Sequence, residues 1–262
     1  MRIMVTGASQ GGIGGEICLR LTRDALRRSE PVSVAACATA DRPALRAVVD
    51  ELHELGARAI ALTGDLADPE VPARLVADAV EFCGGLDVLA SNAGTAKRAP
   101  LATVSPEEWD RIMNIDARAN WLLAKAAHPA LKESRGAIVI TGSVSGIMPH
   151  LGYGSYPAAK AAVAMLARVL AAQFAADGIR VNVASPGPVR TPINPHYDDP
   201  AVLAAREALI PMGRMGETAD VAALVSFLAG PDSRSITGQN ILVDGGMLRY
   251  SLRGLYAAPE PA

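Results

Sequence analysis

Short runs of apolar residues alternate with helical segments along almost the whole chain. Runs such as "LDVLAS" at 86–91 and "AIVIT" at 137–141 are apolar at nearly every position. A strand of this composition is buried on both faces, which is typical of a parallel sheet with helices on each side. Strands and helices that alternate through right-handed crossovers form a doubly wound α/β fold, and such folds bind ligands at the carboxyl edge of the sheet.

The alternation predicts about seven strands and six helices, without a repeat or linker that would divide residues 1–262 into separate domains. The strands are expected near 2–6, 31–37, 58–63, 86–91, 136–141, 180–185 and 239–243, and the helices near 13–28, 42–55, 68–83, 105–133, 156–177 and 217–229. The segment "PGPVRTPINPHYDDP" at 186–200 contains too many prolines for regular structure. Because it follows a strand, it should lie at the ligand-binding edge, in a substrate loop at about 186–212. The last part of the chain, about 248–262, is expected to form a C-terminal tail.

Charge and cysteine content exclude several classes of function. A formal net charge of −2 gives no electrostatic basis for binding nucleic acid or an anionic membrane. The chain begins "MRIMVTGAS", without the apolar core of a signal peptide, and Arg168 and Gln173 interrupt its longest apolar runs well short of a membrane span. Cys18, Cys37 and Cys83 are scattered and odd in number, so we expect reduced thiols in a cytoplasmic protein. The four histidines are also scattered, which predicts no metal site.

A glycine-rich turn, "TGASQGGIGGEI" at 6–17, joins the first predicted strand to the first helix. Glycine permits a tight turn and a close approach of the backbone, and a helix N-terminus offers free N–H groups to a phosphate. Ordinary strand-to-helix turns have a similar composition, but the position at the first strand of a doubly wound sheet favours dinucleotide binding. "GDLAD" and "SNAG", which end the third and fourth strands, would hold an adenine ring and bring bare backbone to the cofactor. The residues expected at the cofactor in these three segments are Gly7, Ser9, Gln10, Gly12, Ile13, Asp65, Leu66, Asn92, Ala93 and Gly94.

The segment "YPAAK" places Tyr156 and Lys160 one helical turn apart at the start of an apolar, alanine-rich run. Residues four apart share a helix face, with Cβ atoms about 5–6 Å apart. An ammonium that close to a phenol stabilises the phenolate and makes the tyrosine usable in proton transfer near neutral pH. Taken alone, the pair could equally be a surface tyrosine and a surface lysine that share helical spacing, so the other motifs decide its meaning.

Seven motifs occur in one order along the chain: "TGASQGGIG", "GDLAD", "LDVLASNAG", "VITGSVSG", "YPAAK", "VNVASPGPVRT" and "TGQNILVDGGM". Together they resemble the short-chain dehydrogenase/reductase family over nearly the whole chain. The resemblance implies a single Rossmann-type domain that transfers a hydride between NAD(P) and a carbonyl or secondary alcohol. In that family the tyrosine is the acid/base, the lysine holds the nicotinamide ribose, and a serine polarises the substrate oxygen, which implies these roles for Tyr156, Lys160 and Ser143. Tyr153 cannot replace Tyr156, because Pro157 stands four residues after it.

One motif position leaves a choice open, and two others depart modestly from the family pattern. Ser145 is the alternative to Ser143, but it would point away from the site if the chain stays extended. The glycine turn has one residue more than the family's TGxxxGIG, so Gly12-Ile13-Gly14 is matched to GIG and a slightly wider turn is expected. The family's usual pair of asparagines is reduced to Ser91-Asn92, which is a modest change.

A larger departure lies in "EEWDRIMNIDARAN". Counting from Trp109, the family's catalytic asparagine falls on Asp116 and not on Asn114, and these positions lie about 200° apart around a helix. Either a carboxylate anchors water beside Lys160, or the helix shifts its register. Because the family's asparagine acts largely through its backbone carbonyl, Asp116 is expected to be tolerated as the fourth catalytic residue.

The end of the second strand, "VAACATADR", bears on the choice between NAD and NADP. NAD-dependent members of the family usually have an aspartate there for the ribose hydroxyls, whereas this chain has Cys37. Thr39 and Arg42 could receive a 2′-phosphate, so NADP(H) is expected to be preferred over NAD(H). Thr191 is placed to hydrogen-bond the carboxamide or the phosphates. The residues expected at the cofactor after the sixth strand are Pro186, Gly187, Val189 and Thr191.

The substrate is less defined than the reaction. "TPIN", "IPMGRMGE" and "DGGMLRY" resemble glucose 1-dehydrogenases, which implies a sugar or polyol. The alternative is a ketoreductase similar to 3-oxoacyl-acyl-carrier-protein reductases, through "GSVSG" and "CATAD". A function of another class, a dinucleotide-binding sensor or scaffold without turnover, is kept open by Asp116 and opposed by the intact Ser143, Tyr156 and Lys160.

The helix that begins at Tyr156 also predicts assembly. Val163, Leu166, Leu170 and Phe174 should face the sheet, and the opposite side is lined by small apolar residues. These are Ala158, Ala161, Ala162, Ala164, Ala171 and Ala172. An exposed small-residue surface favours close association of helices, although alanine is also simply the best helix former. Members of the family commonly pair through this helix and the long helix before it, so the resemblance implies a homotetramer, with the tail "LRYSLRGLYAAPEPA" near a neighbouring subunit.

Overall fold

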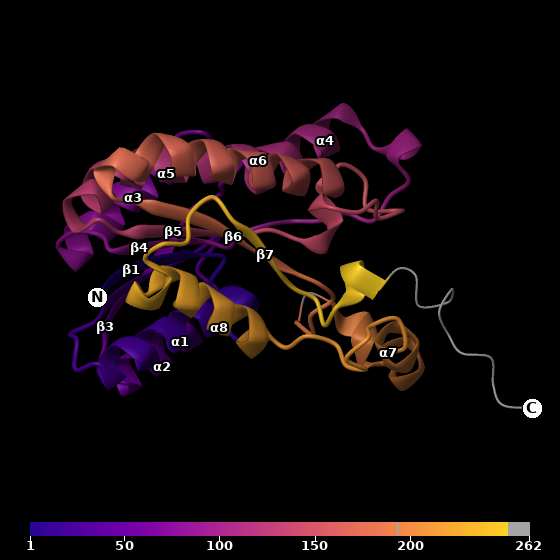
Figure 1. The fold of residues 1–262 in the computed structure, drawn as a ribbon, viewed down its shortest axis with the longest axis horizontal. Coiled ribbons are helices and arrows are strands. Elements are labelled where there is room, and N and C mark those ends of the chain that lie inside the picture. The colour runs from indigo at the N-terminus through magenta and orange to yellow at the C-terminus, as the bar shows by residue number, and fades with distance from the viewer. Residues whose placement is uncertain (193, 251–262) are drawn as a thin grey trace, which may run out of the picture.

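A single seven-stranded sheet forms the centre of the molecule (Figure 1). This computed structural model describes residues 1–192 and 194–250. The strands lie in the order β3-β2-β1-β4-β5-β6-β7, and every neighbouring pair is parallel. Their bounds are β1 (Arg2–Thr6), β2 (Ser33–Ala38), β3 (Arg58–Thr63), β4 (Val88–Ser91), β5 (Ala137–Thr141), β6 (Arg180–Pro186) and β7 (Asn240–Val243). The predicted doubly wound α/β fold is therefore confirmed. The order reverses between β1 and β4, so a crevice opens there at the carboxyl ends of the strands.

Helices cover both faces of the sheet (Figure 1). One face carries α1 (Ile13–Arg27), α2 (Pro43–Glu54) and α8 (Thr218–Ala229), and the other carries α3 (Val71–Cys83), α5 (Ala119–Ser134) and α6 (Tyr156–Phe174). Side chains alternate along each strand, so consecutive residues enter opposite layers. Ile3 and Val5 join one core cluster, whereas Met4 joins the other, and all three are fully buried.

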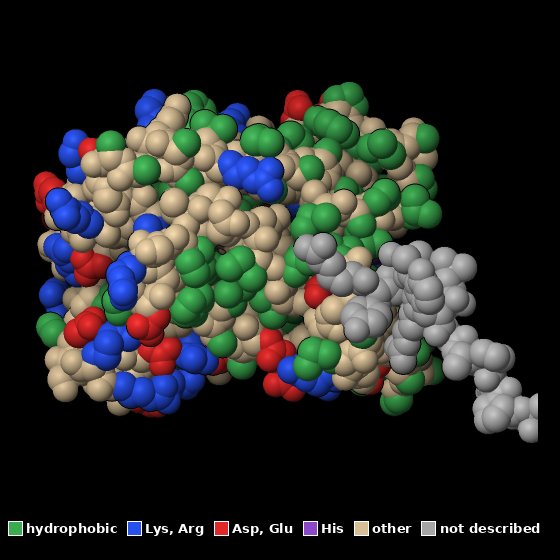
Figure 2. Space-filling model, in the orientation of Figure 1, with side chains coloured by type: hydrophobic (Ala, Val, Ile, Leu, Met, Phe, Trp, Pro, Cys, Tyr) green, Lys and Arg blue, Asp and Glu red, His purple; other side chains and the backbone are tan. Residues whose placement is uncertain are grey.

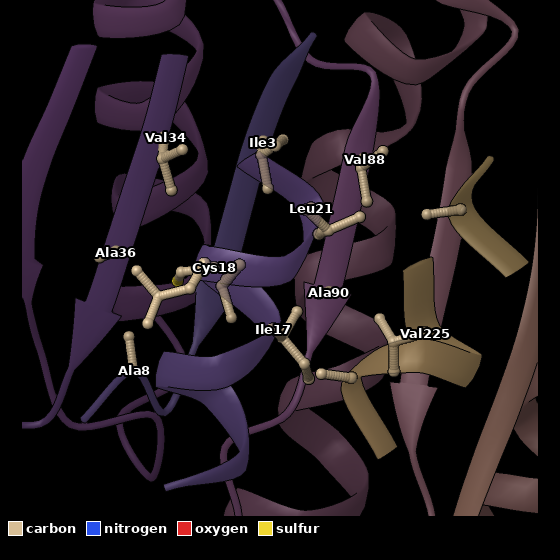
Figure 3. Packing of buried hydrophobic residues seen from close by; sticks show 14 of the residues in the cluster. Ile3, Ala8, Ile17, Cys18, Leu21, Val34, Ala36, Val88, Ala90 and Val225 are labelled. Carbon is tan, nitrogen blue, oxygen red and sulfur yellow. The ribbon is translucent and has the colours of Figure 1, made fainter. Parts of the chain in front are cut away.

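The first of these clusters is built mainly from strands β1, β2 and β4 and from helices α1, α2 and α8, and Figure 3 shows part of it. Ile17 and Leu21, one helical turn apart on α1, point toward the sheet and meet Val225 of α8 and Val88 of β4. Cys18 lies in the same layer, and burial raises the pKa of its thiol. All three cysteines are free and buried among apolar residues.

The helix predicted over 105–133 is interrupted by a π-helical turn at Asn114–Arg118. It begins with a capping box between Ser105 and Glu108, runs as α4 (Pro106–Met113), and passes through a π-helical turn at Asn114–Arg118 before α5. A π-turn adds a residue to the helical repeat and so changes which side chains face the protein. Asp116 lies in this turn and is fully buried.

The proline-rich segment is more ordered than its composition predicts. After a 3₁₀ turn at Pro195–Asp198, the chain forms a helix, α7 (Pro200–Glu207), that we did not predict. Asp199 caps it by accepting a hydrogen bond from the Ala201 amide at 2.8 Å, and Pro200 occupies its first turn. The dipeptide Asp-Pro is a helix-start signal that could have revealed this element.

Helix α6 faces the sheet through its predicted apolar residues. Val163 and Leu170 are buried, and Leu166 and Phe174 pack against the same core cluster. Ala171 is also buried, so its assignment to the outer side of the helix was wrong. The outer side carries Ala158, Ala161, Ala162 and Ala172, together with Met165 and Val169, which are 56% and 46% exposed.

Among the described residues one helical segment, 156–177, is long and apolar enough to cross a membrane by length and composition alone. This differs from the expectation that Arg168 and Gln173 would break the run. The segment is one of the layers that cover the sheet, and it carries Lys160, which is buried inside the protein. One side of the segment therefore packs on the sheet, while its outer side is exposed.

Candidate active site

Two adjoining cavities open at the carboxyl edge of the sheet. The first has a volume of about 570 Å³ and lies against the ends of β1, β4, β5 and β6. The second has a volume of about 510 Å³ and lies against the ends of β1, β2 and β3. Both are lined by Gly7, Ser9, Ala93, Gly94 and Thr95, so the switch point of the sheet separates two halves of one groove.

Nearly all predicted site residues line these cavities. The residues at the first are Gly12, Ile13, Asn92, Asp116, Ser143, Tyr156, Lys160, Pro186, Gly187, Val189 and Thr191. The residues at the second are Thr39, Asp65 and Leu66. Gln10 lines neither cavity: it is exposed, and its amide donates to the Ala44 carbonyl at 2.9 Å.

The glycine turn is shaped by close backbone contacts. Gly11 has φ +72°, and the Gly12 amide donates to the Ser9 carbonyl at 3.0 Å, so the extra residue is taken up in a tight turn just before α1. A Cβ on Gly14 would lie 2.3 Å from the Gly7 carbonyl oxygen, a distance that real Cβ atoms do not reach. The first turn of α1 is thus held against the end of β1, where its free N–H groups face the groove.

Asn92 connects the ends of three strands beneath the groove through hydrogen bonds. Its Nδ2 donates to the Thr6 carbonyl at 3.2 Å, and its Oδ1 accepts from the Thr141 hydroxyl at 3.0 Å. The Thr6 hydroxyl in turn accepts from the amides of Asn92 and Ala93. One asparagine therefore fixes β1, β4 and β5 relative to one another at the switch point.

The second cavity contains an ion pair that the sequence did not reveal. Arg111 of α4 donates to Asp65 Oδ2 at 3.0 Å, and the other oxygen of Asp65 accepts from the Ala67 amide. These contacts lower the pKa of Asp65, chiefly through the amide and then through the arginine. Arg42 and Cys37 line the same cavity at the end of β2. Arg111 belongs to no motif, since it reaches the cavity only through the tertiary packing of α4.

Tyr156 and Lys160 face the first cavity from the start of α6. Lys160 is only 4% exposed, and its Nζ lies 5.6 Å from the centre of the Tyr156 ring. The ammonium donates to the Thr141 carbonyl at 3.0 Å and pairs with Asp116 Oδ1 at 3.1 Å. The two side chains are thus not a solvated surface pair but part of a buried charged cluster.

The π-turn brings Asp116, and not Asn114, to Lys160. Asp116 Oδ2 also accepts from the Thr95 amide at 2.9 Å, and its backbone carbonyl accepts from Asn120 at 2.8 Å. Burial raises the pKa of Asp116, and the charge of Lys160 opposes the rise. Burial alone would lower the pKa of Lys160, but the attraction of Asp116 and of Tyr156 outweighs it, so the pKa is raised and the ammonium is kept.

Two serines face the first cavity after β5. The chain turns into a 3₁₀ helix at Val144–Gly146, so it does not stay extended and the prediction that Ser145 would point away was wrong. Ser143 Oγ accepts from the Ser145 amide at 3.1 Å, whereas Ser145 Oγ shares a hydrogen bond of 2.9 Å with His150 Nδ1. Ser145 is therefore engaged by a side chain, and the hydroxyl hydrogen of Ser143 remains to be donated.

The outer part of the first cavity is lined by an aromatic stack and two arginines. The His150 ring stacks on the Tyr153 ring at 4.0 Å, and Tyr153 lies 6.3 Å from the Tyr156 ring. Arg98 donates to the Tyr153 hydroxyl at 3.0 Å. Arg206, in the last turn of α7, lines the same space. Arg206 was not predicted, because no pattern marks it and its helix was not expected.

Comparisons with known proteins agree with this geometry. Residues 7–248 match a family profile described as enoyl-(acyl carrier protein) reductase. The chain is 37% identical over 254 residues to a glucose 1-dehydrogenase of Gluconobacter oxydans, covering 95% of this chain and 92% of the relative. It is 35% identical over 251 residues to 3beta-hydroxysteroid dehydrogenase 1 of Eggerthella lenta, covering 95% and 94%.

Solved structures give the same result. A dehydrogenase/reductase from Sinorhizobium meliloti 1021 superposes with a TM-score of 0.84 at 35% identity, covering 94% of each chain. A candidate NAD(P)-dependent gluconate 5-dehydrogenase from Beutenbergia cavernae, with bound NADP at low occupancy, has a TM-score of 0.85 at 32% identity. That alignment covers 94% of this chain and 96% of the other. A candidate 2-deoxy-D-gluconate 3-dehydrogenase from Agrobacterium tumefaciens, with bound NADP, has a TM-score of 0.83 at 30% identity, covering 94% and 96%.

Proposed function

Because the chain belongs to the short-chain dehydrogenase/reductase family of NAD(P)-dependent oxidoreductases, we propose that the first cavity is where it transfers a hydride between a nicotinamide and a carbonyl or secondary alcohol. The observation that carries the proposal is the buried cluster of Lys160 and Asp116 directly beside Tyr156. A buried ion pair is costly unless it serves a purpose, and perturbed ionisable groups in a cleft mark functional sites. A dinucleotide sensor without turnover would need no such cluster.

The groove fits a dinucleotide. Bare backbone lines the groove at Gly94, where a Cβ would lie 2.7 Å from Asp116 Oδ1, and Gly14 lets the start of α1 pack closely against the end of β1. The start of α1 would hold the pyrophosphate, Leu66 and Asp65 the adenosine end, and Thr191 the nicotinamide end. When bound, the nicotinamide gives or takes the hydride.

Tyr156 is the acid and base of the reaction. In reduction its phenol donates a proton to the carbonyl oxygen, and in oxidation its phenolate removes the proton from the alcohol. Ser143 donates a hydrogen bond to the same oxygen, because its own Oγ already accepts from the Ser145 amide. This fixed donor stabilises the charge that develops on the oxygen.

Lys160 serves both the tyrosine and the cofactor. Two of the donors on its ammonium are directed at Thr141 and Asp116, and a third is available for the ribose. The ammonium lies 5.6 Å from the centre of the Tyr156 ring. Asp116 holds the ammonium in place and keeps it charged. The asparagine that the family usually has at this position is neutral, so it could not stabilise the ammonium by charge.

NADP(H) is the preferred cofactor in this proposal. Thr39 and Arg42 line the adenosine end, where Cys37 offers no carboxylate to ribose hydroxyls. The nearby carboxylate of Asp65 is already paired with Arg111. Arg42 would therefore meet a 2′-phosphate without a competing negative charge beside the strand end.

The substrate is a small alcohol or ketone of the sugar or polyol type. The outer wall of the cavity offers several hydrogen-bonding side chains, which suit a hydroxylated molecule. They are Ser145, His150, Tyr153, Asn194 and Tyr197. Relatives named for glucose and structural neighbours named for gluconates support this class over a 3-oxoacyl-acyl-carrier-protein reductase.

The protein acts as a cytoplasmic homotetramer in this proposal. The outer face of α6 exposes Met165 and Val169 among alanines, and α5 exposes Trp121 at 45%. Two adjacent helices with exposed apolar side chains suit a symmetric interface. The tail that was expected to reach a neighbouring subunit lies mostly outside the described residues. Light scattering that gives the mass of one subunit at micromolar concentration would contradict the assembly.

A spectrophotometric panel tests the proposed activity. Sugars, polyols and ketones are offered with NADP⁺, NAD⁺ and their reduced forms, and absorbance of the reduced nicotinamide is followed. Turnover by the native chain, with loss in Tyr156→Phe, is expected. Cofactor binding without turnover of any member, equal in both proteins, would support the sensor instead.

A further inference from the structure

One hydrogen-bonded pair in the first cavity takes no part in the proton transfer described above. Ser145 Oγ and His150 Nδ1 lie 2.9 Å apart, and both residues line the cavity together with Tyr156. Ser145 is only 5% exposed, and among the described residues His150 is the one partner of its hydroxyl. A hydroxyl has one hydrogen to donate and two lone pairs, so part of its hydrogen-bonding capacity remains for a ligand.

The pair lies next to the proposed donor to the substrate oxygen. Ser143 and Ser145 belong to the same 3₁₀ turn after β5, and the Ser145 amide donates to Ser143 Oγ at 3.1 Å. The two hydroxyl groups therefore keep a fixed relation to each other at one wall of the cavity. A substrate oxygen bound by Ser143 and Tyr156 would bring the oxygen on the next carbon close to Ser145.

The protonation state of His150 decides in which direction this hydrogen bond runs. A neutral ring that carries its proton on Nε2 accepts at Nδ1, so the Ser145 hydroxyl donates to the ring and keeps only its lone pairs for a ligand. A protonated ring donates from Nδ1 instead, which releases the serine hydrogen. Ser145 thus accepts a hydrogen bond from a ligand in the first state and can donate one in the second.

The surroundings of His150 favour the neutral ring. Burial lowers its pKa, and the charges of Arg206 and then of Arg98 lower it further. Arg206 comes from α7 and Arg98 from the loop between β4 and α4. The other ionisable groups around the ring are the phenols of Tyr153, which stacks on it at 4.0 Å, and of Tyr156 in the same cavity. Near neutral pH, Ser145 is therefore an acceptor toward the cavity.

The segment that carries His150 is otherwise apolar. Ile147, Met148 and Leu151 are exposed, and the bridge between Ala99 and Tyr153 joins this segment to the loop before α4. At the end of the molecule that carries α4, Figure 2 shows mostly hydrophobic and uncharged side chains, whereas charged side chains gather at the end that holds the N-terminus. A neutral hydrogen bond is strengthened where water and competing charges are few.

We propose that Ser145, held by His150, accepts a hydrogen bond from a hydroxyl on the carbon next to the reacting one, so that the site selects α-hydroxy ketones and vicinal diols. A substrate without that hydroxyl would leave the buried Ser145 oxygen without its ligand partner, and such a site discriminates against the analogue. Ser145 and His150 would then determine specificity, while Tyr156 and Ser143 act on the reacting oxygen. This inference rests on the proposed function, because it names the substrate unit that the same site recognises.

Three small ketones test the inference: hydroxyacetone, methoxyacetone and 2-butanone. Hydroxyl and methoxy groups activate the neighbouring carbonyl in a similar way, but only the hydroxyl can donate a hydrogen bond, and 2-butanone has the size of hydroxyacetone. With NADPH near neutral pH, the native protein should favour hydroxyacetone over methoxyacetone by about 3- to 10-fold in kcat/KM, the range of one neutral hydrogen bond. Equal kcat/KM values for these two ketones would overturn the inference.

Variants of the pair separate hydrogen bonding from size. Ser145→Ala should lower the kcat/KM ratios of hydroxyacetone to both other ketones by about 3- to 10-fold, although its amide can still donate to Ser143. His150→Asn places an amide oxygen near the position of Nδ1 and should keep the preference, whereas His150→Leu should lose it. His53→Asn is the matched control, since His53 is exposed and does not line the cavity. A loss confined to the methoxyacetone ratio would mean that the site selects by size and would overturn the inference.

The pH dependence gives a readout that size does not affect. As the pH falls through the lowered pKa of His150, the ring takes up a proton and the serine hydrogen is released, so the preference for hydroxyacetone over methoxyacetone should decrease. Arg206→Gln removes one of the charges that keep the ring neutral, so the decrease should begin at a higher pH. His150→Asn should keep the preference at every pH. A preference that is independent of pH in the native protein would overturn the assignment of Ser145 as an acceptor.

A measurement without turnover separates this inference from the proposed activity. Nitrogen-15 NMR of the histidine rings, with His150→Asn to identify the signals, shows which nitrogen carries the proton. Neutral His150 should carry it on Nε2, and 1,2-propanediol should shift the Nδ1 signal of the protein–NADP⁺ complex at a lower concentration than 1-methoxy-2-propanol does. If these results are obtained but no ketone turns over, the proposed activity fails and the hydroxyl site stands. If ketones turn over and the proton lies on Nδ1, the hydroxyl site fails and the activity stands.

Discussion

The two halves of the groove are built in different ways. The proposed adenosine half lies at the ends of β1, β2 and β3, and its Asp65 carboxylate is paired with Arg111. The proposed substrate half is lined by side chains from the connections after β4, β5 and β6. In our proposal the adenosine half binds the cofactor, which the members of the family share. The other half binds the substrate, which differs between them.

This contrast separates the residues proposed for catalysis from those proposed for choosing the substrate. Asp116, Lys160 and Tyr156 line the first cavity from the π-turn and from α6, and the ion pair of Asp116 with Lys160 is buried there. Arg206 lies on α7, outside the layers that cover the sheet, where a change of sequence would leave the core intact. A fold of this kind can therefore change its substrate without losing its reaction.

The largest effect is expected at Tyr156 in the first cavity. Tyr156→Phe should lower kcat/KM on the best substrate by about 10²- to 10⁴-fold, the usual contribution of a general acid–base group. The Kd of NADPH, measured by fluorescence, should stay within about twofold, because the ring remains. Near-native turnover would show that Tyr156 is not the acid/base.

A backbone change tests the glycine turn that precedes α1. Gly14→Ala places a Cβ 2.3 Å from the Gly7 carbonyl oxygen, so α1 or β1 must move. Overpacking of this kind costs about 1–3 kcal/mol of unfolding free energy, and NADPH binding should weaken with it. Urea unfolding and cofactor titration measure both. Gly216→Ala is the control, since its Cβ would approach no heavy atom closer than 3.3 Å. Equal behaviour of the two variants would mean that the tight contact does not shape the groove.

The cofactor choice gives a smaller effect. Arg42→Ala should reduce the ratio of NADP to NAD affinity by about tenfold or more, because a charge-assisted hydrogen bond contributes about 1.5–3 kcal/mol. NADH affinity should change little, and titration of both reduced cofactors checks it. Arg46→Ala serves as the control, since Arg46 is paired with Asp41 and does not line the cavity. Tighter binding of NADH than NADPH by the native protein would reverse the assignment.

The smallest effect is expected at Asp116. Asp116→Asn removes the carboxylate that pairs with Lys160 at 3.1 Å and leaves a side chain of nearly the same size. The attraction of Asp116 raises the pKa of Lys160 against the effect of burial, so loss of the carboxylate should lower that pKa. The high-pH limb of the pH–rate profile, where Lys160 loses its proton, should therefore move to lower pH. An unchanged profile, or a shift to higher pH, would mean that the carboxylate does not act on the pair.

The features that could be predicted from the sequence are those that depend on local spacing, and the features that were missed depend on tertiary packing. The sheet, the glycine turn and the pair Tyr156–Lys160 depend on local spacing and apolar periodicity, which are visible in the chain itself. Arg206 and Arg111 reach the groove through the packing of α7 and α4, so no local pattern identifies them. Ser145 was misplaced because the 3₁₀ turn after β5 was not expected. Gln10 was carried over from a motif, yet the longer turn directs it outward.

Deuterium transfer tests the central claim that this groove moves a hydride between a nicotinamide and a substrate carbon. NADPH deuterated on one or the other face of nicotinamide C4 is incubated with the protein and the ketone that it reduces best in the panel, and the alcohol is analysed by mass spectrometry. The account predicts one deuterium on the carbinol carbon from one of the two cofactors and none from the other, and loss of the product in Tyr156→Phe. Alcohol formed without deuterium from either cofactor would contradict it.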